Sequence, residues 1–197
     1  MSRLPLRLWA WTLLWRATEP AVAELLVVAM IVTHPQALAW RRLVRESLAE
    51  LTDRVFAVGH EVQVAVRFAI GAPPPRMFPR GKLRLHAMLA DEMDAFGDLA
   101  LLNVSDGDCN AGKSWHTFAW ALRHFPRAAL IFKQDDDTIV HWPTALPRML
   151  GSWARPPLQR LYVGTLAPSY SCPEVLDGRG PCAAGALYGF SRDIVGW

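Results

Sequence analysis

The stretch that decides the fold is Ala128-Ala129-Leu130-Ile131-Phe132-Lys133-Gln134-Asp135-Asp136-Asp137, an apolar run that ends in three consecutive aspartates. An apolar run of this length, preceded by a proline and followed by charges, predicts a buried strand. Ligands of open α/β sheets bind beyond the carboxyl ends of the strands, where these carboxylates would lie. If the segment stays extended, Asp135 and Asp137 share one target, while Asp136 faces elsewhere.

The three aspartates have two competing interpretations. Acidic runs usually belong to solvated loops. Two carboxylates that leave other coordination positions open suit Mg²⁺ or Mn²⁺ carrying a phosphorylated substrate. The run follows a strand directly and precedes a further apolar pair, Ile139-Val140. This context favours the metal site.

The composition indicates one globular domain. The chain has 197 residues, of which 52% are hydrophobic and 20% are charged, and this balance excludes a disordered chain. The formal net charge is +3, and the arginines are scattered apart from Arg41, Arg42 and Arg45, so a nucleic-acid partner is not indicated. We expect residues 24–197 to form the domain.

Residues 1–23 form an apolar segment that resembles a signal peptide. Arg3 and Arg7 precede an apolar stretch, and Ala21-Val22-Ala23 has the small-x-small pattern of a cleavage site. A short amphipathic helix is the other interpretation. Neither this stretch nor residues 25–32 reaches the ~20 apolar residues that span a bilayer.

The cysteines leave a disulfide open. Cys172 and Cys182 flank a Gly/Pro-rich stretch and could pair in an oxidising compartment, and free thiols fit the sequence equally well. None of the three cysteines has zinc-type spacing. Asn103-Val104-Ser105 is an N-glycosylation sequon, and it indicates a glycosylation site only if the chain is secretory.

Hydrophobic periodicity predicts strands alternating with helices, and hence an α/β fold with a mostly parallel sheet. Asn110 is expected to cap a helix whose apolar stripe, Trp115, Phe118, Ala119, Leu122 and Phe125, faces the core. The other expected helices are residues 38–51, 83–96 and 143–150, and the expected strands are residues 25–32, 62–70, 99–104, 128–132, 160–163 and 186–190.

The segment Leu130–Val140 resembles the "F-x-L-K-x-D-D-D-x-F-V" core of the β1,3-galactosyl- and β1,3-N-acetylglucosaminyltransferase family. Each further element is degenerate, but their shared order is more specific than any one of them. Residues 110–114 are closest to the protozoan branch that builds phosphoglycan side chains. The other elements are Arg41–Ser47 ("R-R-x-x-I-R-x-T-W"), Val66–Gly71 ("x-F-x-L-G"), Glu92–Leu101 ("E-x-x-x-Y-G-D-I-L"), Asp106–Trp115 ("D-S-Y" to "N-x-x-x-K-T") and Arg179–Asp193 ("Y-P-x-Y-C-x-G-x-G-Y-V-L-S-x-D").

The resemblance implies a GT-A fold and an inverting hexosyltransferase. Such an enzyme transfers galactose or N-acetylglucosamine from UDP-galactose or UDP-N-acetylglucosamine to a hydroxyl of a glycan or glycoprotein acceptor, in β1,3 linkage. It uses Mn²⁺ (or Mg²⁺) and works on the lumenal side of the Golgi membrane, so membrane association of the full-length protein is expected. The implied partners are the UDP-sugar and the acceptor.

The resemblance also implies roles for the three aspartates. Asp135 and Asp137 would hold the metal, which neutralises the diphosphate and stabilises it as a leaving group. Asp136 would face the ribose or the sugar.

Four further residues are expected at the donor. Arg45 would reach the diphosphate or the uracil, the alternative being a solvated helix arginine. Lys113, in the first turn of a helix, suits phosphate, and Lys133 ends its strand near the nucleotide, where a structural role fits as well. Gly185 would let the backbone approach a sugar closely, although ordinary turn chemistry also explains it.

The family's catalytic base is absent from this sequence. An "E-D-V" element supplies that base further along in the family, and we expect it beyond Trp197, so the GT-A domain is expected to be incomplete at its C-terminus. Asp193 is an unconvincing substitute. One alternative is therefore a non-catalytic UDP-sugar-binding remnant. The other is a haloacid-dehalogenase-type phosphatase, with Asp135 as nucleophile and Asp137 as acid/base. Such enzymes need a later lysine, which this sequence lacks.

Overall fold

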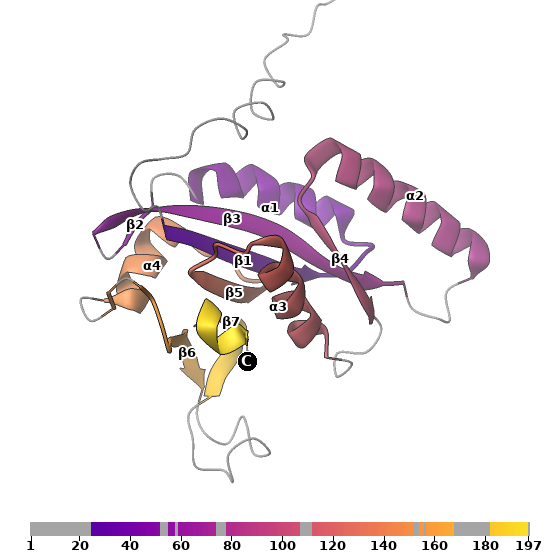
Figure 1. Cartoon of the computed structure of the whole chain (residues 1–197). Coiled ribbons are helices and arrows are strands. Elements are labelled where there is room, and N and C mark those ends of the chain that lie inside the picture. Colours follow the sequence, from indigo (N-terminus) through magenta and orange to yellow (C-terminus); the bar gives the residue numbers. More distant parts are fainter. Residues whose placement is uncertain are drawn as a thin grey trace, which may run out of the picture.

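The computed structural model describes residues 25–51, 55–57, 59–73, 78–106, 112–151, 154–155, 157–167 and 182–196. These residues form one mixed sheet flanked by helices (Figure 1). The strands are β1 (Leu25–Thr33), β2 (Val55–Ala57), β3 (His60–Ala72), β4 (Leu99–Ser105), β5 (Leu130–Asp135), β6 (Tyr162–Ala167) and β7 (Cys182–Ser191). The helices are α1 (Leu38–Leu51), α2 (Pro79–Phe96), α3 (Lys113–His124), α4 (Trp142–Leu150) and α5 (Arg192–Val195).

The sheet is mostly parallel, as the sequence predicts. Its order is β2-β3-β1-β5-β7-β6, and β4 pairs with β3. β1 pairs in parallel with both β3 and β5, and β3 pairs in parallel with β4. β7 runs antiparallel to β5 and to β6, and the short β2 runs antiparallel to β3. The chain fills β3 and β4 on one side of β1 before it crosses to β5, so the order reverses at β1.

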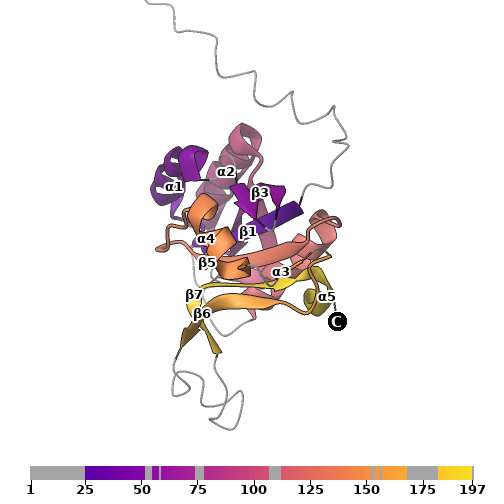
Figure 2. The ribbon, with the colours of Figure 1, turned by 90° about the vertical axis from the view of Figure 1, so that its left-hand side faces the viewer.

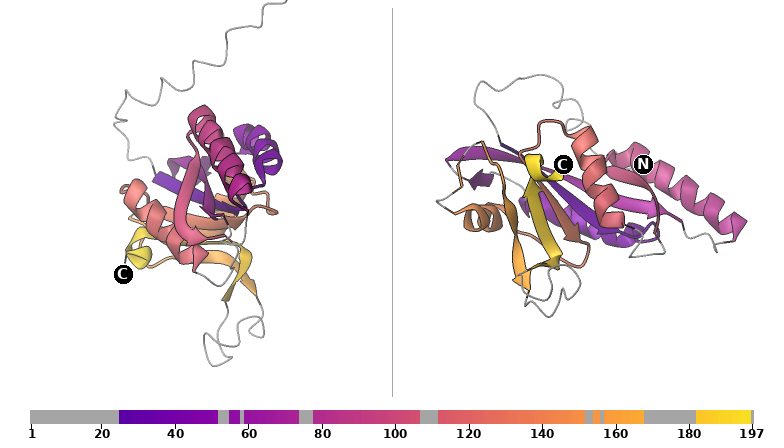
Figure 3. Two further views of the ribbon diagram at one scale, coloured as in Figure 1. Left: turned by 90° about the vertical axis from the view of Figure 1, so that its right-hand side faces the viewer. Right: turned by 60° about the horizontal axis from the view of Figure 1, so that its bottom comes forward.

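Helices cover both faces of the sheet. The side views place α1, α2 and α4 on one face and α3 and α5 on the other (Figures 2 and 3). Alternate residues of β1 follow this division, since Val27 and Ala29 pack in the cluster that contains α4, whereas Val28 and Met30 pack in the cluster that contains α3. A strand buried on both faces has no polar side, which explains the continuous apolar run of β1.

The bounds predicted from sequence agree with the structure to within four residues. Helix α1 has the predicted bounds, whereas α2 begins at Pro79, four residues before the predicted start, because proline is tolerated in a first helical turn. Gly112 precedes α3, and Asn110, the predicted cap, lies outside the described residues. Trp115 was expected in the core but is 62% exposed, because only the Phe118 side of α3 meets the sheet. The short elements β2 and α5 were not predicted.

A close approach between β5 and β7 requires a glycine. Gly189 pairs with Phe132, whose ring packs edge-on against Trp142 with ring centroids 5.2 Å apart. A Cβ atom on Gly189 would lie 2.5 Å from Cδ1 of Phe132 and 2.8 Å from the carbonyl oxygen of Ile131. The ring is fully buried and has no room to move away.

Gly189→Ala is therefore expected to lower the free energy of unfolding by about 1–3 kcal/mol, the usual cost of overpacking a core. Urea denaturation of the two proteins measures the difference. Gly196→Ala is the control, because a Cβ there would meet its nearest atom, the carbonyl oxygen of Arg192, at 3.4 Å. Equal stability of Gly189→Ala and the wild type would contradict the packing argument.

Candidate functional site

The three aspartates lie at the carboxyl end of β5, but they do not form an extended segment. The strand ends at Asp135, and the backbone N–H of Thr138 donates to the carbonyl of Asp135 at 3.2 Å, which closes a turn through Asp136 and Asp137. The chain turns because the pairing of β5 with β1 ends at Asp135 and its pairing with β7 ends at Gln134. The strand alternation from which we expected Asp135 and Asp137 to share one target, with Asp136 facing elsewhere, is therefore wrong.

The acidic turn has contacts on both sides of the sheet. The ammonium group of Lys133 pairs with the carboxylate of Asp135, whose side chain is 38% exposed. Both residues point to the α3 face, as alternate residues of one strand do. From the other face, the indole N–H of Trp40 in α1 donates to the carbonyl of Asp136 at 2.5 Å. The side chain of Asp137 is exposed.

The carboxylates of this turn are of the ligand type that a divalent cation sharing a substrate's phosphates uses. The described residues contain no group of three or more His, Cys, Asp or Glu side chains that could hold an ion by themselves. Asp135 and Asp137 offer hard oxygen ligands at an exposed edge. Mg²⁺-type ions commonly use one or two carboxylates, and phosphate oxygens and water complete the coordination. The Lys133 pair shows that Asp135 is already held by a positive charge without an ion.

A second charged cluster lies at the ends of β1, β3 and β4. The carboxylate of Asp106, which follows β4, is 1% exposed. It pairs with the ammonium group of Lys113, it is 2.6 Å from Nδ1 of His34, and it accepts the backbone N–H of Gly71 at 3.1 Å. Lys113 also donates to the carbonyl of Thr33 at 2.8 Å. Sequence reasoning named Lys113 but missed His34 and Asp106 as a pair, because they are 72 positions apart.

Gly71 permits this cluster. A Cβ atom there would lie 2.8 Å from the carbonyl oxygen of Val104 and 2.9 Å from Oδ1 of Asp106. Only a glycine lets the end of β3 approach the carboxylate so closely. The predicted place of Lys113, in the first turn of α3, is confirmed, and its ammonium group meets a buried carboxylate there.

Arg45 lies away from both clusters. It belongs to an ion-pair ladder between α1 and α2, in which it donates to Asp98 at 2.7 and 2.8 Å and to Glu92 at 2.7 Å. Arg41, one turn earlier, is fully buried and donates to Glu92 and to the carbonyl of His34. The guanidinium of Arg45 also lies over the ring of Phe96, 4.1 Å from its centroid.

These contacts are structural, and the alternative interpretation of Arg45 as a solvated helix arginine is wrong, since 12% of its side chain is exposed. Because α1 runs from the carboxyl edge of the sheet, where Trp40 contacts Asp136, Arg45 lies farther from the acidic turn than Arg41 does. The expected contact of Arg45 with the donor nucleotide stays a prediction.

The ladder shifts the pKa values of its members. Burial alone would raise the pKa of Glu92, but the hydrogen bonds from Arg41 and Arg45 hold it below its ordinary value. Burial alone would lower the pKa of Arg45, but Asp98 and Glu92 raise it. The ionised ladder therefore stabilises the packing of α1 on α2.

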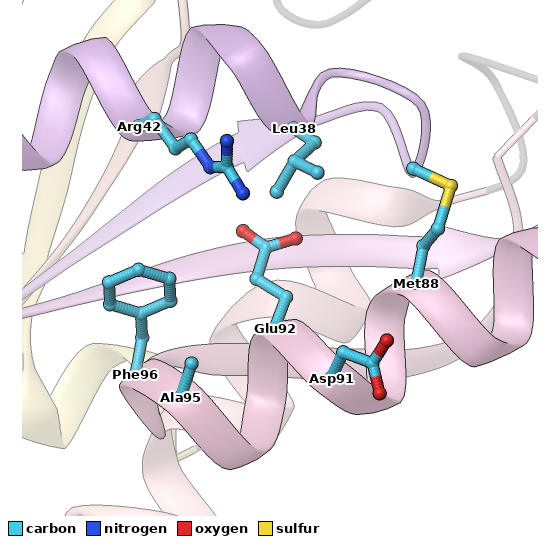
Figure 4. Close-up of a pocket in the computed structure, with 7 residues that line it drawn as sticks. All are labelled: Leu38, Arg42, Met88, Asp91, Glu92, Ala95 and Phe96. Atoms are coloured by element: carbon cyan, nitrogen blue, oxygen red, sulfur yellow. The ribbon is translucent and has the colours of Figure 1, made fainter.

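Among the described residues, three pockets that lie outside the acidic turn can be delineated. The smallest, about 170 Å³, lies between α1 and α2 beside the ladder, where Arg42 and Glu92 point toward one another (Figure 4). One of about 500 Å³ lies between α2 and the ends of β3 and β4, and one of about 560 Å³ adjoins Leu25 and α5. None of these three is lined by Asp135, Asp136 or Asp137.

The remaining predicted residues fall near the C-terminus. Gly185 lies in the first half of β7, which begins at the carboxyl edge of the sheet. Cys172 lies outside the described residues, so both alternatives for Cys172 and Cys182, a disulfide and free thiols, stay open. Asp193, in α5, accepts the backbone N–H of Arg160 at 2.9 Å; its hydrogen bond with Ser191 is the largest cause of a pKa below the ordinary value. The neighbouring residue, Arg192, donates its backbone N–H to the carbonyl of Ala129, just before the start of β5. Asp193 therefore lies at the edge of the sheet opposite the acidic turn.

Comparison of the chain with models of known protein families and with curated protein sequences yields no match. Within the part of the chain that the structure describes, no helix is long and apolar enough to cross a membrane.

Replacing Glu92 tests the ladder. Glu92→Gln leaves the fully buried guanidinium of Arg41 without a carboxylate partner, while Arg45 keeps its pair with Asp98, and the variant is expected to lose about 3–5 kcal/mol of unfolding free energy at pH 7. The pKa of Glu92 is lowered in the folded state, so its contribution is present above the ordinary glutamate value of about 4.3 and is lost as the pH falls through the lower folded-state value. The difference between wild type and variant should narrow on acidification.

Urea titrations at neutral and acidic pH measure both effects. Asp91→Asn, at an exposed carboxylate one residue earlier in α2, is the matched control. If Glu92→Gln and Asp91→Asn had the same stability at pH 7, the ladder would have no structural role.

Proposed function

We propose that this chain binds the diphosphate of a UDP-sugar through a divalent cation at Asp135 and Asp137, as the donor-binding domain of a GT-A hexosyltransferase. The observation that carries the proposal is the acidic turn at the carboxyl end of β5, beside β1, where the strand order reverses. Ligands of open α/β sheets bind at such switch points. The ligand class, a UDP-sugar, is inferred from the flanking segments. They resemble motifs of the β1,3-galactosyl- and β1,3-N-acetylglucosaminyltransferase family and occur in the same order.

The chemistry of the turn supports a phosphorylated ligand. Mn²⁺ held by Asp135 and Asp137 would neutralise the diphosphate and stabilise it as the leaving group. Lys133 and Lys113 bring two ammonium groups to the same sheet edge, each now paired with a carboxylate. The ribose or sugar role of Asp136 and the sugar contact of Gly185 belong to the same proposal. So do the lumenal Golgi location and the inverting transfer of galactose or N-acetylglucosamine to a glycan hydroxyl.

A non-catalytic UDP-sugar-binding domain is the second candidate. An inverting transfer needs a base beside the acceptor hydroxyl. Among the described residues, Asp193 is the acid nearest in sequence to the expected position of that base, and it lies at the opposite edge of the sheet. Donor binding without sugar transfer would favour this candidate, and transfer by the chain itself would favour the enzyme.

Calorimetric titration with UDP in the presence of Mn²⁺ tests donor binding. We expect binding that depends on the metal and that falls at least roughly tenfold in Asp135→Ala and in Asp137→Ala, because each variant loses one charged ligand. The control is Asp91→Ala, which removes an exposed carboxylate from α2. This variant should bind UDP with Mn²⁺ as tightly as the wild type does. If UDP bound with no divalent cation, the proposal would fail.

The pair between Lys133 and Asp135 makes a separate prediction. The ammonium group competes with a cation for the carboxylate, so Lys133→Gln should raise the affinity for Mn²⁺ alone by roughly fivefold, which corresponds to about 1 kcal/mol for a partly exposed pair. If Lys133 contacts the diphosphate in the complex, the affinity for UDP with Mn²⁺ should fall in the same variant. Electron paramagnetic resonance measures free Mn²⁺, and Lys82→Gln in α2 is the control. Unchanged Mn²⁺ affinity would show that the pair does not compete with the ion.

A further inference from the structure

The imidazole of His34 is held at one nitrogen and open at the other. Nδ1 lies 2.6 Å from Oδ2 of Asp106, while 69% of the His34 side chain is exposed. Within the described part of the chain, this is the ring's one hydrogen bond. The buried carboxylate therefore fixes the ring and leaves Nε2 facing outward at the end of β1.

The partners of Asp106 determine which ring nitrogen carries the proton. An ionised carboxylate is only an acceptor, so Nδ1 must donate to it. The same carboxylate also pairs with the ammonium group of Lys113. In a neutral ring with the proton on Nδ1, Nε2 is an acceptor. The cluster thus presents one fixed hydrogen-bond acceptor.

This acceptor lies on the side of the acidic turn where a nucleoside fits. β1, α1, β3, α2 and β4 form a β-α-β-α-β unit, the half of an open α/β fold that binds a mononucleotide. Val32 pairs with Asp135, and His34 follows two residues later. With a rise of about 3.3 Å per residue and a strand spacing of about 4.8 Å, the Cα atom of His34 is about 8 Å from that of Asp135. A diphosphate at the turn leaves its nucleoside within reach of His34.

We propose that Nε2 of His34 accepts a hydrogen bond from the imide N–H of the nucleobase, and that this contact selects uracil. Uracil carries a hydrogen on N3, whereas N3 of cytosine is an acceptor and would face Nε2 without a proton between them. The inference rests on the proposed function, because it needs a nucleotide at the acidic turn. Asp106 and Lys113 are positioning residues that fix the ring and its tautomer.

Titration with three nucleotides and Mn²⁺ tests the contact. UDP is expected to bind at least about tenfold more tightly than CDP and than 3-methyl-UDP, in which a methyl group replaces the imide hydrogen, since an unpaired polar group at a binding site costs about that factor. In His34→Ala the affinity for UDP should fall to nearly that for 3-methyl-UDP. His60→Ala, at the start of β3 and the opposite edge of the sheet, should keep the wild-type ratio.

The ratio of the UDP and 3-methyl-UDP affinities separates recognition from stability. A purely structural role of His34 would lower the stability of His34→Ala and leave that ratio unchanged, and this result would overturn the inference. Equal binding of UDP and 3-methyl-UDP by the wild type would overturn it too, while metal-dependent UDP binding would leave the proposed function standing. Loss of all UDP binding in the wild type would instead refute the proposed function, and the inference with it.

Discussion

The carboxylate of Asp106 organises the carboxyl edge of this sheet. It is almost fully buried, and a buried charge is tolerated only when it is paired and hydrogen-bonded. Its partners come from the end of β3 (Gly71), from the first turn of α3 (Lys113) and from the residue after β1 (His34). One group thus holds the ends of two strands and the start of a helix in register. Because breaking a buried pair costs about 3–5 kcal/mol, these three elements are expected to move together.

Two charged networks divide the roles around β1. The ladder of Arg41, Glu92, Arg45 and Asp98 binds α1 to α2 and lies on the face of the sheet that these helices cover. The Asp106 cluster and the pair of Lys133 with Asp135 lie at the carboxyl edge, on the side of α3. In the first network, nearly all the charged groups are paired with one another. The second leaves an imidazole nitrogen and an acidic turn facing outward, and the proposed ligand site therefore lies there.

The acidic turn illustrates how far sequence reasoning reaches. The apolar run before Asp135 predicts both the strand and the place of the carboxylates at the sheet edge, because periodicity and length are local properties. The conformation of the three aspartates was wrongly expected to be extended, because the end of a strand is decided by where its neighbours stop pairing. The prediction that Trp115 lies in the core was wrong for a related reason. Helical spacing indicates which residues share a face of the helix, but not how far the sheet extends beneath that face.

The sequence by itself determined the α/β class, the order of the strands and helices other than β2 and α5, and the edge at which the carboxylates gather. These follow from hydrophobic periodicity, turn residues and the rule that parallel strands need helical crossovers. Only the tertiary structure decided that Arg45 belongs to a ladder between helices and that His34 and Asp106, 72 positions apart, share a hydrogen bond. Such pairs depend on which strands become neighbours, and burial then selects the partners, because a charge removed from water must find its counterpart wherever the fold brings one.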